Sequence, residues 1–72
     1  MKLPKLTPVK SSNLQALGYD QRGLFVRFNG GALYSYPKAP RKLYEEGLEA
    51  ESPGTWFREK VRGHFDHLKH DE

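Results

Sequence analysis

Apolar and polar positions alternate most clearly in the first half of the chain, where they predict β-strands. In residues 24–28 (LFVRF) the first, third and fifth side chains lie on one side of an extended backbone, and the other two lie on the opposite side. Residues 11–20 (SSNLQALGYD) and 32–37 (ALYSYP) flank this segment, and turn-forming residues separate the three. Together they predict a three-stranded antiparallel meander.

The turn at residues 29–31 (NGG) decides which way Tyr34 and Tyr36 point, because a slip of one residue moves every side chain of a strand to the other face. A two-residue turn would place both tyrosines on the face that carries Arg27, and a three-residue turn would place them on the opposite, apolar face. We expect the three-residue turn, because it gathers the aromatic rings on the face that helices can cover. The rings would then lie largely in the core, with their hydroxyl groups at its rim.

The second half of the chain shows helical spacing and predicts two helices. The first covers residues 39–50, with Pro40 in its first turn and an apolar stripe formed by Leu43, Tyr44 and Leu48. Gly47 lowers its intrinsic stability by about 1 kcal/mol relative to alanine, so packing must hold this helix together. The second helix begins with Ser52 as its cap and Pro53 in its first turn, and the residues expected to face the sheet are Phe57, Val61, Phe65 and Leu68.

Residues 1–10 (MKLPKLTPVK) differ from the rest, because Pro4 and Pro8 fix φ and disfavour helix in the residue before each. We therefore expect an α+β fold: a three-stranded antiparallel meander packed against two C-terminal helices, with an extended N-terminal arm. The predicted division is an extended basic arm at residues 1–10, a single domain at 11–69 and a tail at 70–72. The arm is either a segment that orders on a partner or a frayed terminus.

Composition narrows the classes of protein that remain. The chain has 72 residues, a net charge of +3 and no cysteine, so it has neither a disulfide framework nor a thiolate zinc site. No segment approaches the roughly 20 apolar residues of a membrane span. No hydrophobic stretch follows Lys2, so we expect no signal peptide and a cytoplasmic location.

Charge is divided unevenly along the chain. Residues 1–42 contain eight Lys or Arg and one acid, whereas residues 43–72 contain four Lys or Arg and eight acids. This asymmetry predicts two electrostatic faces, one of them suited to phosphates or to an acidic protein surface, unless folding interleaves the two halves.

Nothing in the sequence predicts catalysis or metal binding. His64, His67 and His70 recur every third residue, so on a helix they would drift around the axis and converge poorly on one ion. Glu45 and Glu46 are adjacent and would diverge by about 100° on a helix, which excludes a facing carboxylate pair. We expect a non-enzymatic protein with no cofactor, no metal and no small-molecule substrate.

Across positions 10–65 the chain contains an ordered series of residues: Ser11–Asn13, Gly18–Asp20, Leu24, Val26, Phe28, Tyr34–Tyr36, Pro40, Tyr44, Ala50, Ser52–Gly54, Phe57 and Arg62. This series resembles the KTSC domain family, a short module named for the C-terminus of some lysyl-tRNA synthetases. Arg58 departs from the asparagine that relatives often carry there. The resemblance implies RNA binding. With its basic arm, the chain is also similar to small phage-encoded regulators that bind host RNA polymerase. This likeness implies that the chain acts in the host cytoplasm and inhibits initiation, or causes antitermination near the RNA exit region, or both.

Two functions follow as hypotheses, and a purely structural accessory role is the third possibility. In the first, the chain is a transcription regulator that docks on RNA polymerase, with nascent RNA nearby, through Lys2, Leu3, Lys5, Leu6, Val9, Lys10, Arg22 and Arg27. In the second, it is a single-stranded RNA-binding module in which Tyr34 and Tyr36 stack on bases and the phosphates contact Lys38, Arg41, Lys42, Arg58 and Arg62. Trp56 is a further stacking candidate, and core packing is the alternative role for all of these rings.

Overall fold

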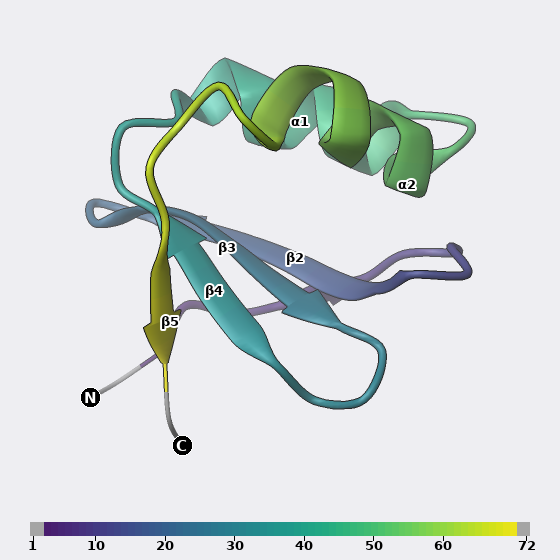
Figure 1. Ribbon diagram of the computed structural model, residues 1–72, viewed down its shortest axis with the longest axis horizontal. Helices are drawn as coiled ribbons and strands as arrows, with labels where there is room; N and C mark the ends of the chain where they lie inside the picture. Colours follow the sequence, from purple (N-terminus) through teal and green to yellow (C-terminus); the bar gives the residue numbers. More distant parts are fainter. Residues whose placement is uncertain (1–2, 71–72) are drawn as a thin grey trace.

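One antiparallel sheet of five strands and two short helices make up residues 3–70, the part of the chain that this computed structural model describes (Figure 1). The strands lie in the sheet in chain order: β1 (Thr7–Pro8), β2 (Leu14–Asp20), β3 (Gly23–Phe28), β4 (Leu33–Tyr36) and β5 (Leu68–His70). The helices are α1 (Arg41–Glu49) and α2 (Pro53–Trp56), and a π-helical segment, η1 (Phe57–Val61), continues the second.

The predicted α+β class is confirmed, but the three-stranded meander describes only the inner strands of the sheet. β2, β3 and β4 are the predicted meander. β1 comes from the predicted arm and pairs with β2, and β5 comes from a segment predicted to be helical and pairs with β4. Both additions are only two or three residues long and extend a sheet edge that already exists.

The predicted hairpin register is confirmed. Val26 lies opposite Tyr34 and Leu24 opposite Tyr36, so both tyrosines share the apolar face of β3. The N–H of Phe28 donates to the carbonyl of Ala32, which closes a three-residue turn. Two consecutive glycines of this turn have φ near +100°, a region that glycine adopts without strain.

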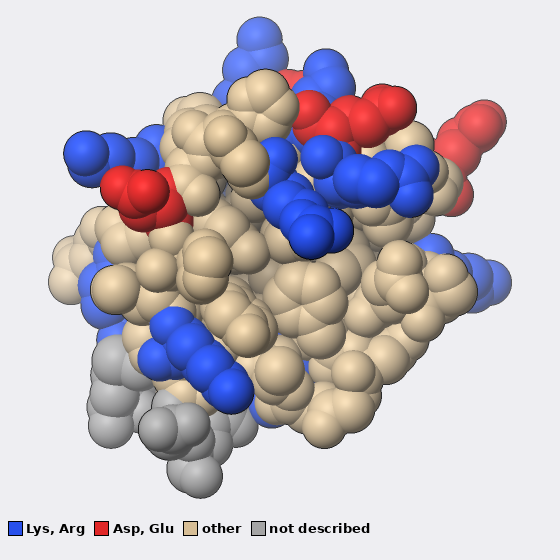
Figure 2. Space-filling model, in the orientation of Figure 1, with Lys and Arg blue, Asp and Glu red and all other residues tan. Residues whose placement is uncertain are grey.

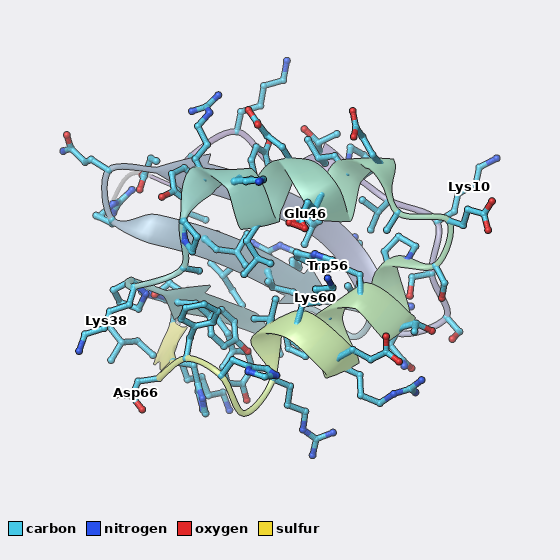
Figure 3. The ribbon with its side chains drawn as sticks, turned by 90° about the horizontal axis from the view of Figure 1, so that it is seen from above. Lys10, Lys38, Glu46, Trp56, Lys60 and Asp66 are labelled. Carbon is cyan, nitrogen blue, oxygen red and sulfur yellow. The ribbon has the colours of Figure 1, made fainter. Side chains whose placement is uncertain are left out.

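The two helices cover that apolar face of the sheet (Figure 1). Leu43, Trp56 and Val61 from the helices are buried against it, whereas Leu48 of the predicted stripe is 37 % exposed. Trp56 lies between the two helices (Figure 3). A Cβ on Gly47 would come within 2.6 Å of the Trp56 ring, so the glycine is what lets the indole lie against α1. Packing thus compensates for the weak helix propensity, as predicted.

The second helix is shorter than predicted. It ends at Val61, and Gly63 follows with φ +81°, a left-handed conformation that stops the helix and reverses the chain. Phe65 is therefore half-buried in the loop that follows, and Leu68 is 56 % exposed on β5. The predicted stripe along this helix is correct for Phe57 and Val61 and wrong for these two residues, because their spacing is interrupted by the turn.

The far face of the sheet is covered by the N-terminal segment, which runs beneath the strands in Figure 1. A Cβ on Gly18 would lie 2.6 Å from Cδ2 of Leu6 and 2.9 Å from the carbonyl oxygen of Lys5, so the arm packs directly on β2. Phe25 and Leu33 are each 1 % exposed on this face. The described part of the arm, residues 3–10, is therefore an extended segment that belongs to the folded unit.

Candidate nucleic-acid interface

A hollow of about 540 Å³ opens between β4, η1 and the loop after η1. We call it the aromatic hollow. Six rings line it, from Phe28, Tyr34, Tyr36, Phe57, Phe65 and His67. Ala32, Arg62, Gly63 and Asp66 complete its lining.

The rings of the aromatic hollow hold one another in place. Phe28 contacts Phe57 and Tyr34 edge to face, with ring centroids 5.2 and 5.5 Å apart. Tyr36 packs on Phe57 at 5.8 Å, and His67 lies 5.3 Å from Tyr34. Edge-to-face pairs at these distances are favourable arrangements of aromatic side chains. The hollow therefore has a pre-formed wall of aromatic surface.

Tyr36 supplies a neutral hydroxyl group to this wall. Its side chain is almost fully buried, and that burial, reinforced by Tyr34 and opposed by Arg62, raises the pKa of Tyr36 to about 12. The phenol therefore stays protonated to a higher pH than an ordinary tyrosine does. It makes no side-chain hydrogen bond to any residue within 3–70, so its O–H is available to donate to a ligand.

A second hollow, of about 450 Å³, adjoins the first and shares Phe28, Phe57 and Arg62 with it. We call it the polar hollow. Its other lining residues are Ser12, Asn13, Leu14, Asn29, Gly54 and Arg58. No Asp or Glu is among these lining residues, so its charge comes from two arginines.

The two hollows together form one groove. Figure 2 shows an uncharged area of the surface below the helices, with Lys and Arg side chains above it and Asp and Glu side chains among them. Within residues 3–70, neither Arg58 nor Arg62 forms an ion pair or a side-chain hydrogen bond. The arrangement can therefore offer apolar ring surface and unneutralised positive charge to the same ligand.

The structure brings together only part of the set predicted to bind nucleic acid. Tyr34, Tyr36, Arg58 and Arg62 meet in the groove. Lys38 lies beyond the loop, in a smaller hollow that adjoins the aromatic one through Gly63, Phe65 and Asp66. Lys38 and Asp66 lie at the end of the molecule opposite Lys10 (Figure 3).

The other two basic residues predicted for nucleic acid lie on α1, outside the groove lining. Arg41 pairs with Glu45 at 3.4 Å and lies over the ring of Tyr19 at 5.9 Å. Lys42 is exposed on the same helix. The predicted basic segment at residues 38–42 is thus divided between two surfaces of the molecule.

The residues predicted to bind a protein partner are spread over the arm and the β2–β3 hairpin. Lys2 lies outside the described residues, and Lys5 and Lys10 are exposed. Leu3, Leu6 and Val9 are half-buried, and Leu6 packs against Gly18. The apolar side chains of the arm therefore already have contacts within this chain.

The two arginines of that set have structural partners. Arg22 binds the carboxylate of Asp20, with Nη2 to Oδ2 at 2.6 Å, and lies over the Phe25 ring at 5.2 Å. Hydrogen bonding from Arg22 holds the pKa of Asp20 below its usual value. Nη1 of Arg27 donates to the carbonyl of Gly31 at 3.0 Å.

Sequence reasoning missed several groove residues. Phe28 and Phe57 were assigned to the core alone, and His67 was placed on a helix. Asn13 and Asn29 lie 16 positions apart and meet only because β2 and β3 pair. The sequence does show an asparagine beside an end of each strand, Asn13 before β2 and Asn29 after β3. Only the pairing register of the two strands reveals that these asparagines lie close together.

Two classes of site are absent from the described residues. Among residues 3–70 no three His, Cys, Asp or Glu side chains gather closely enough to hold a metal ion. His70 instead lies 2.7 Å from the hydroxyl of Ser35 on the far face. The helices of residues 3–70 are all too short or too polar to cross a bilayer.

Known proteins resemble this chain over most of its length. The sequence profile of the KTSC domain matches residues 10–65. A protein from Tsukamurella paurometabola is 39 % identical over 62 residues, covering 83 % of this chain and 92 % of the relative. One from Stutzerimonas stutzeri is 42 % identical over 57 residues, covering 76 % and 80 %. The crystal structure of a KTSC domain protein from Yersinia pestis matches with a TM-score of 0.85 and 28 % identity, covering 96 % of this chain and all of that one.

Proposed function

This chain belongs to the KTSC domain family, and from that premise we propose that it is a non-enzymatic module that binds single-stranded RNA in the groove. The observation that carries the proposal is the junction of the two hollows. There, Phe28, Phe57 and Arg62 belong to both, so a wall of rings passes directly into a basic surface. Unpaired nucleotides need this combination of stacking surface and positive charge.

The aromatic hollow suits an unpaired base. Stacking of a base on an aromatic side chain contributes about 1–3 kcal/mol, and it is available only where ring surface is open to a ligand. Tyr34 is half-buried and its ring lines the hollow, whereas Trp56 is buried between the helices. Tyr34 is therefore the ring we expect to contact a base, and Trp56 serves the core.

The arginines suit the RNA backbone. Arg58 and Arg62 are exposed side chains on the second helix and at its end. A guanidinium group without an internal carboxylate partner can form paired hydrogen bonds to a phosphate. One acidic group, Asp66, lines the aromatic hollow, and no acidic group lines the polar hollow.

Binding to RNA polymerase, which the resemblance implies, stays a prediction. Leu6 packs against Gly18, so the arm would have to leave the sheet before its apolar side chains could contact a partner. The groove needs no such rearrangement, which is why we favour RNA as the ligand.

The test is a fluorescence anisotropy titration with a labelled short single-stranded RNA at several salt concentrations. Phosphate contacts predict an affinity that falls steeply as salt rises. Tyr34→Ala should weaken binding by about tenfold, the equivalent of one lost stacking contact. Tyr44→Ala is the matched control, because Tyr44 is also half-buried but stacks on Tyr19 outside the groove. Absence of binding at low salt, or equal losses in both variants, would contradict the proposal.

A further inference from the structure

The loop Ser11–Asn13 is braced from several directions. The hydroxyl of Ser11 accepts hydrogen bonds from the N–H groups of Asn13 and Leu14, at 3.1 and 3.2 Å. Nδ2 of Asn29 donates to the carbonyl of Ser12 at 2.8 Å and more weakly to that of Ser11 at 3.4 Å. The N–H of Asn29 donates to the carbonyl of Asn13 at 2.9 Å. These hydrogen bonds tie the backbone of the loop to Asn29 in the neighbouring β3–β4 turn.

The start of the second helix closes the loop from the other side. A Cβ on Gly54 would lie 3.0 Å from Oγ of Ser11 and 3.8 Å from Nδ2 of Asn13. A larger residue would push against the braced hydroxyl. Gly54 thus allows the helix to approach the loop closely and to place Arg58, one turn later, over the same hollow.

This bracing uses Ser11 and Asn29 but leaves two neighbouring side chains without partners. The side chains of Ser12 and Asn13 are exposed, line the polar hollow and form no hydrogen bond to any residue within 3–70. They face a hollow that also receives Arg58 and Arg62. A hydroxyl, an amide and two guanidinium groups are all hydrogen-bond donors, and no carboxylate lines the space.

We propose that the polar hollow is a phosphate-binding subsite, lined by the braced loop and by Arg58 and Arg62. This inference rests on the proposed function, because the phosphate would belong to the nucleotide whose base occupies the aromatic hollow. The division follows from charge: the one carboxylate in the groove, Asp66, lines the aromatic hollow and would repel an anion there. Base and phosphate thus have separate places on either side of the shared residues.

The arrangement also makes the subsite pre-organised. A loop whose backbone is already held loses little conformational entropy when Asn13 donates to a phosphate. Hydrogen bonds from guanidinium groups to phosphate are among the stronger ones in proteins, because both partners are charged. Arg58 and Asn13 should therefore act on the charge of the ligand and Tyr34 on its base.

The experiment compares two probes of the same base sequence: a short single-stranded RNA and its analogue with an uncharged methylphosphonate backbone. Arg58→Gln should weaken binding of the RNA by about tenfold and reduce the slope of log affinity against log salt by about 0.7, the loss of one phosphate contact. Asn13→Ala should weaken it by about threefold. Arg58→Gln should bind the uncharged analogue nearly as the unmodified protein does, and Asn13→Ala should lose less affinity for the analogue than for the RNA, because the remaining phosphoryl oxygen is a weaker acceptor.

Matched controls come from outside the groove. Arg41→Gln removes an arginine that pairs with Glu45, and Gln15→Ala removes an exposed amide from β2. Neither should change the affinity for either probe. If Arg58→Gln and Asn13→Ala weakened both probes equally, or neither probe, the phosphate assignment would be wrong although RNA binding itself would stand.

A separate titration keeps the subsite testable if RNA does not bind. Inorganic phosphate, added at constant ionic strength against chloride, should shift the NMR signal of the Asn13 side-chain amide and of Nε of Arg58. The Gln15 amide should not move. Shifts with phosphate but no RNA binding would support the subsite and overturn the RNA proposal. Absence of shifts together with salt-insensitive RNA binding would overturn the subsite.

Discussion

Each face of the sheet has an arginine beside an aromatic ring, but the two arginines differ in whether they form an ion pair. On the far face, Arg22 lies over the Phe25 ring and forms an ion pair with Asp20. On the helix face, Arg62 lies close enough to Tyr36 to oppose the rise in its pKa, and it has no ion pair within the described residues. Both are arginine–aromatic neighbours, and only the second has charge to offer a ligand.

Coverage differs between the faces as well. The far face is closed by residues of the arm, which lie against Gly18. At the β4 end, the helix face is left open because the second helix stops at Val61 and the chain leaves through Gly63. A residue's chemistry therefore does not identify a site by itself. What distinguishes the groove is that its ring surface lines an open hollow and that its two arginines form no ion pair within residues 3–70.

The largest effect on stability is expected from a substitution that disrupts packing of the arm on the far face. Gly18→Val should lower the free energy of unfolding by about 3 kcal/mol, because its Cβ would collide with Leu6 and with the Lys5 carbonyl and displace the arm. Valine has the better strand propensity, so the sign of the change is informative. Urea denaturation measures it. Gln15→Val, at an exposed position of the same strand, should change stability by less than about 0.5 kcal/mol.

A smaller effect is expected where the helix face is closed. Gly47→Ala should lower the free energy of unfolding by about 2 kcal/mol, because the added Cβ would press on the ring of Trp56. Helix propensity alone predicts the opposite, a gain of about 1 kcal/mol. Urea denaturation again decides. Lys42→Ala, an exposed position on the same helix, is the control, and a stabilised Gly47→Ala variant would show that the helices are not closely packed there.

The smallest effect concerns the open face and appears only in alkali. The pKa of Tyr36 is about 12 in the folded protein and about 10 in the unfolded chain, so the unfolded chain loses its proton first as pH rises. Stability from this group is complete below pH 10 and is lost progressively between pH 10 and 12, by about 1 kcal/mol at pH 11.

Tyr36→Phe removes the titrating hydroxyl and should flatten that part of the pH profile. Denaturant unfolding at pH 8 and pH 11 gives the comparison. Tyr34→Phe leaves the Tyr36 hydroxyl in place and should retain most of the alkaline loss. An identical pH profile for Tyr36→Phe and the unmodified protein would mean that the hydroxyl is not held in its neutral form.

Part of the groove could be predicted from sequence. Alternation along a strand places Tyr34 and Tyr36 on one face, and the spacing of Arg58 and Arg62 places them one helical turn apart. Each of these two predictions depends only on residues that are close in the sequence. Asn13 reaches the groove because β2 pairs with β3, and His67 reaches it because the chain turns back in the loop after Gly63. Their placement depends on which strands meet, which no short stretch of sequence specifies. The basic segment 38–42 illustrates the reverse case, since adjacent charges separate when one of them begins a helix.

By itself, the sequence determined the inner three strands and the start of the second helix. Both depend on local preferences: alternating side chains, and the hydroxyl of Ser52 accepting from the N–H of Thr55. The glycines of the β3–β4 turn allowed two registers, and the choice between them rested on packing of the rings under the helices. Only the tertiary structure decided β1, β5 and the closed far face. Strands of two or three residues make too few hydrogen bonds to form alone, so they exist because a sheet edge is already there to receive them.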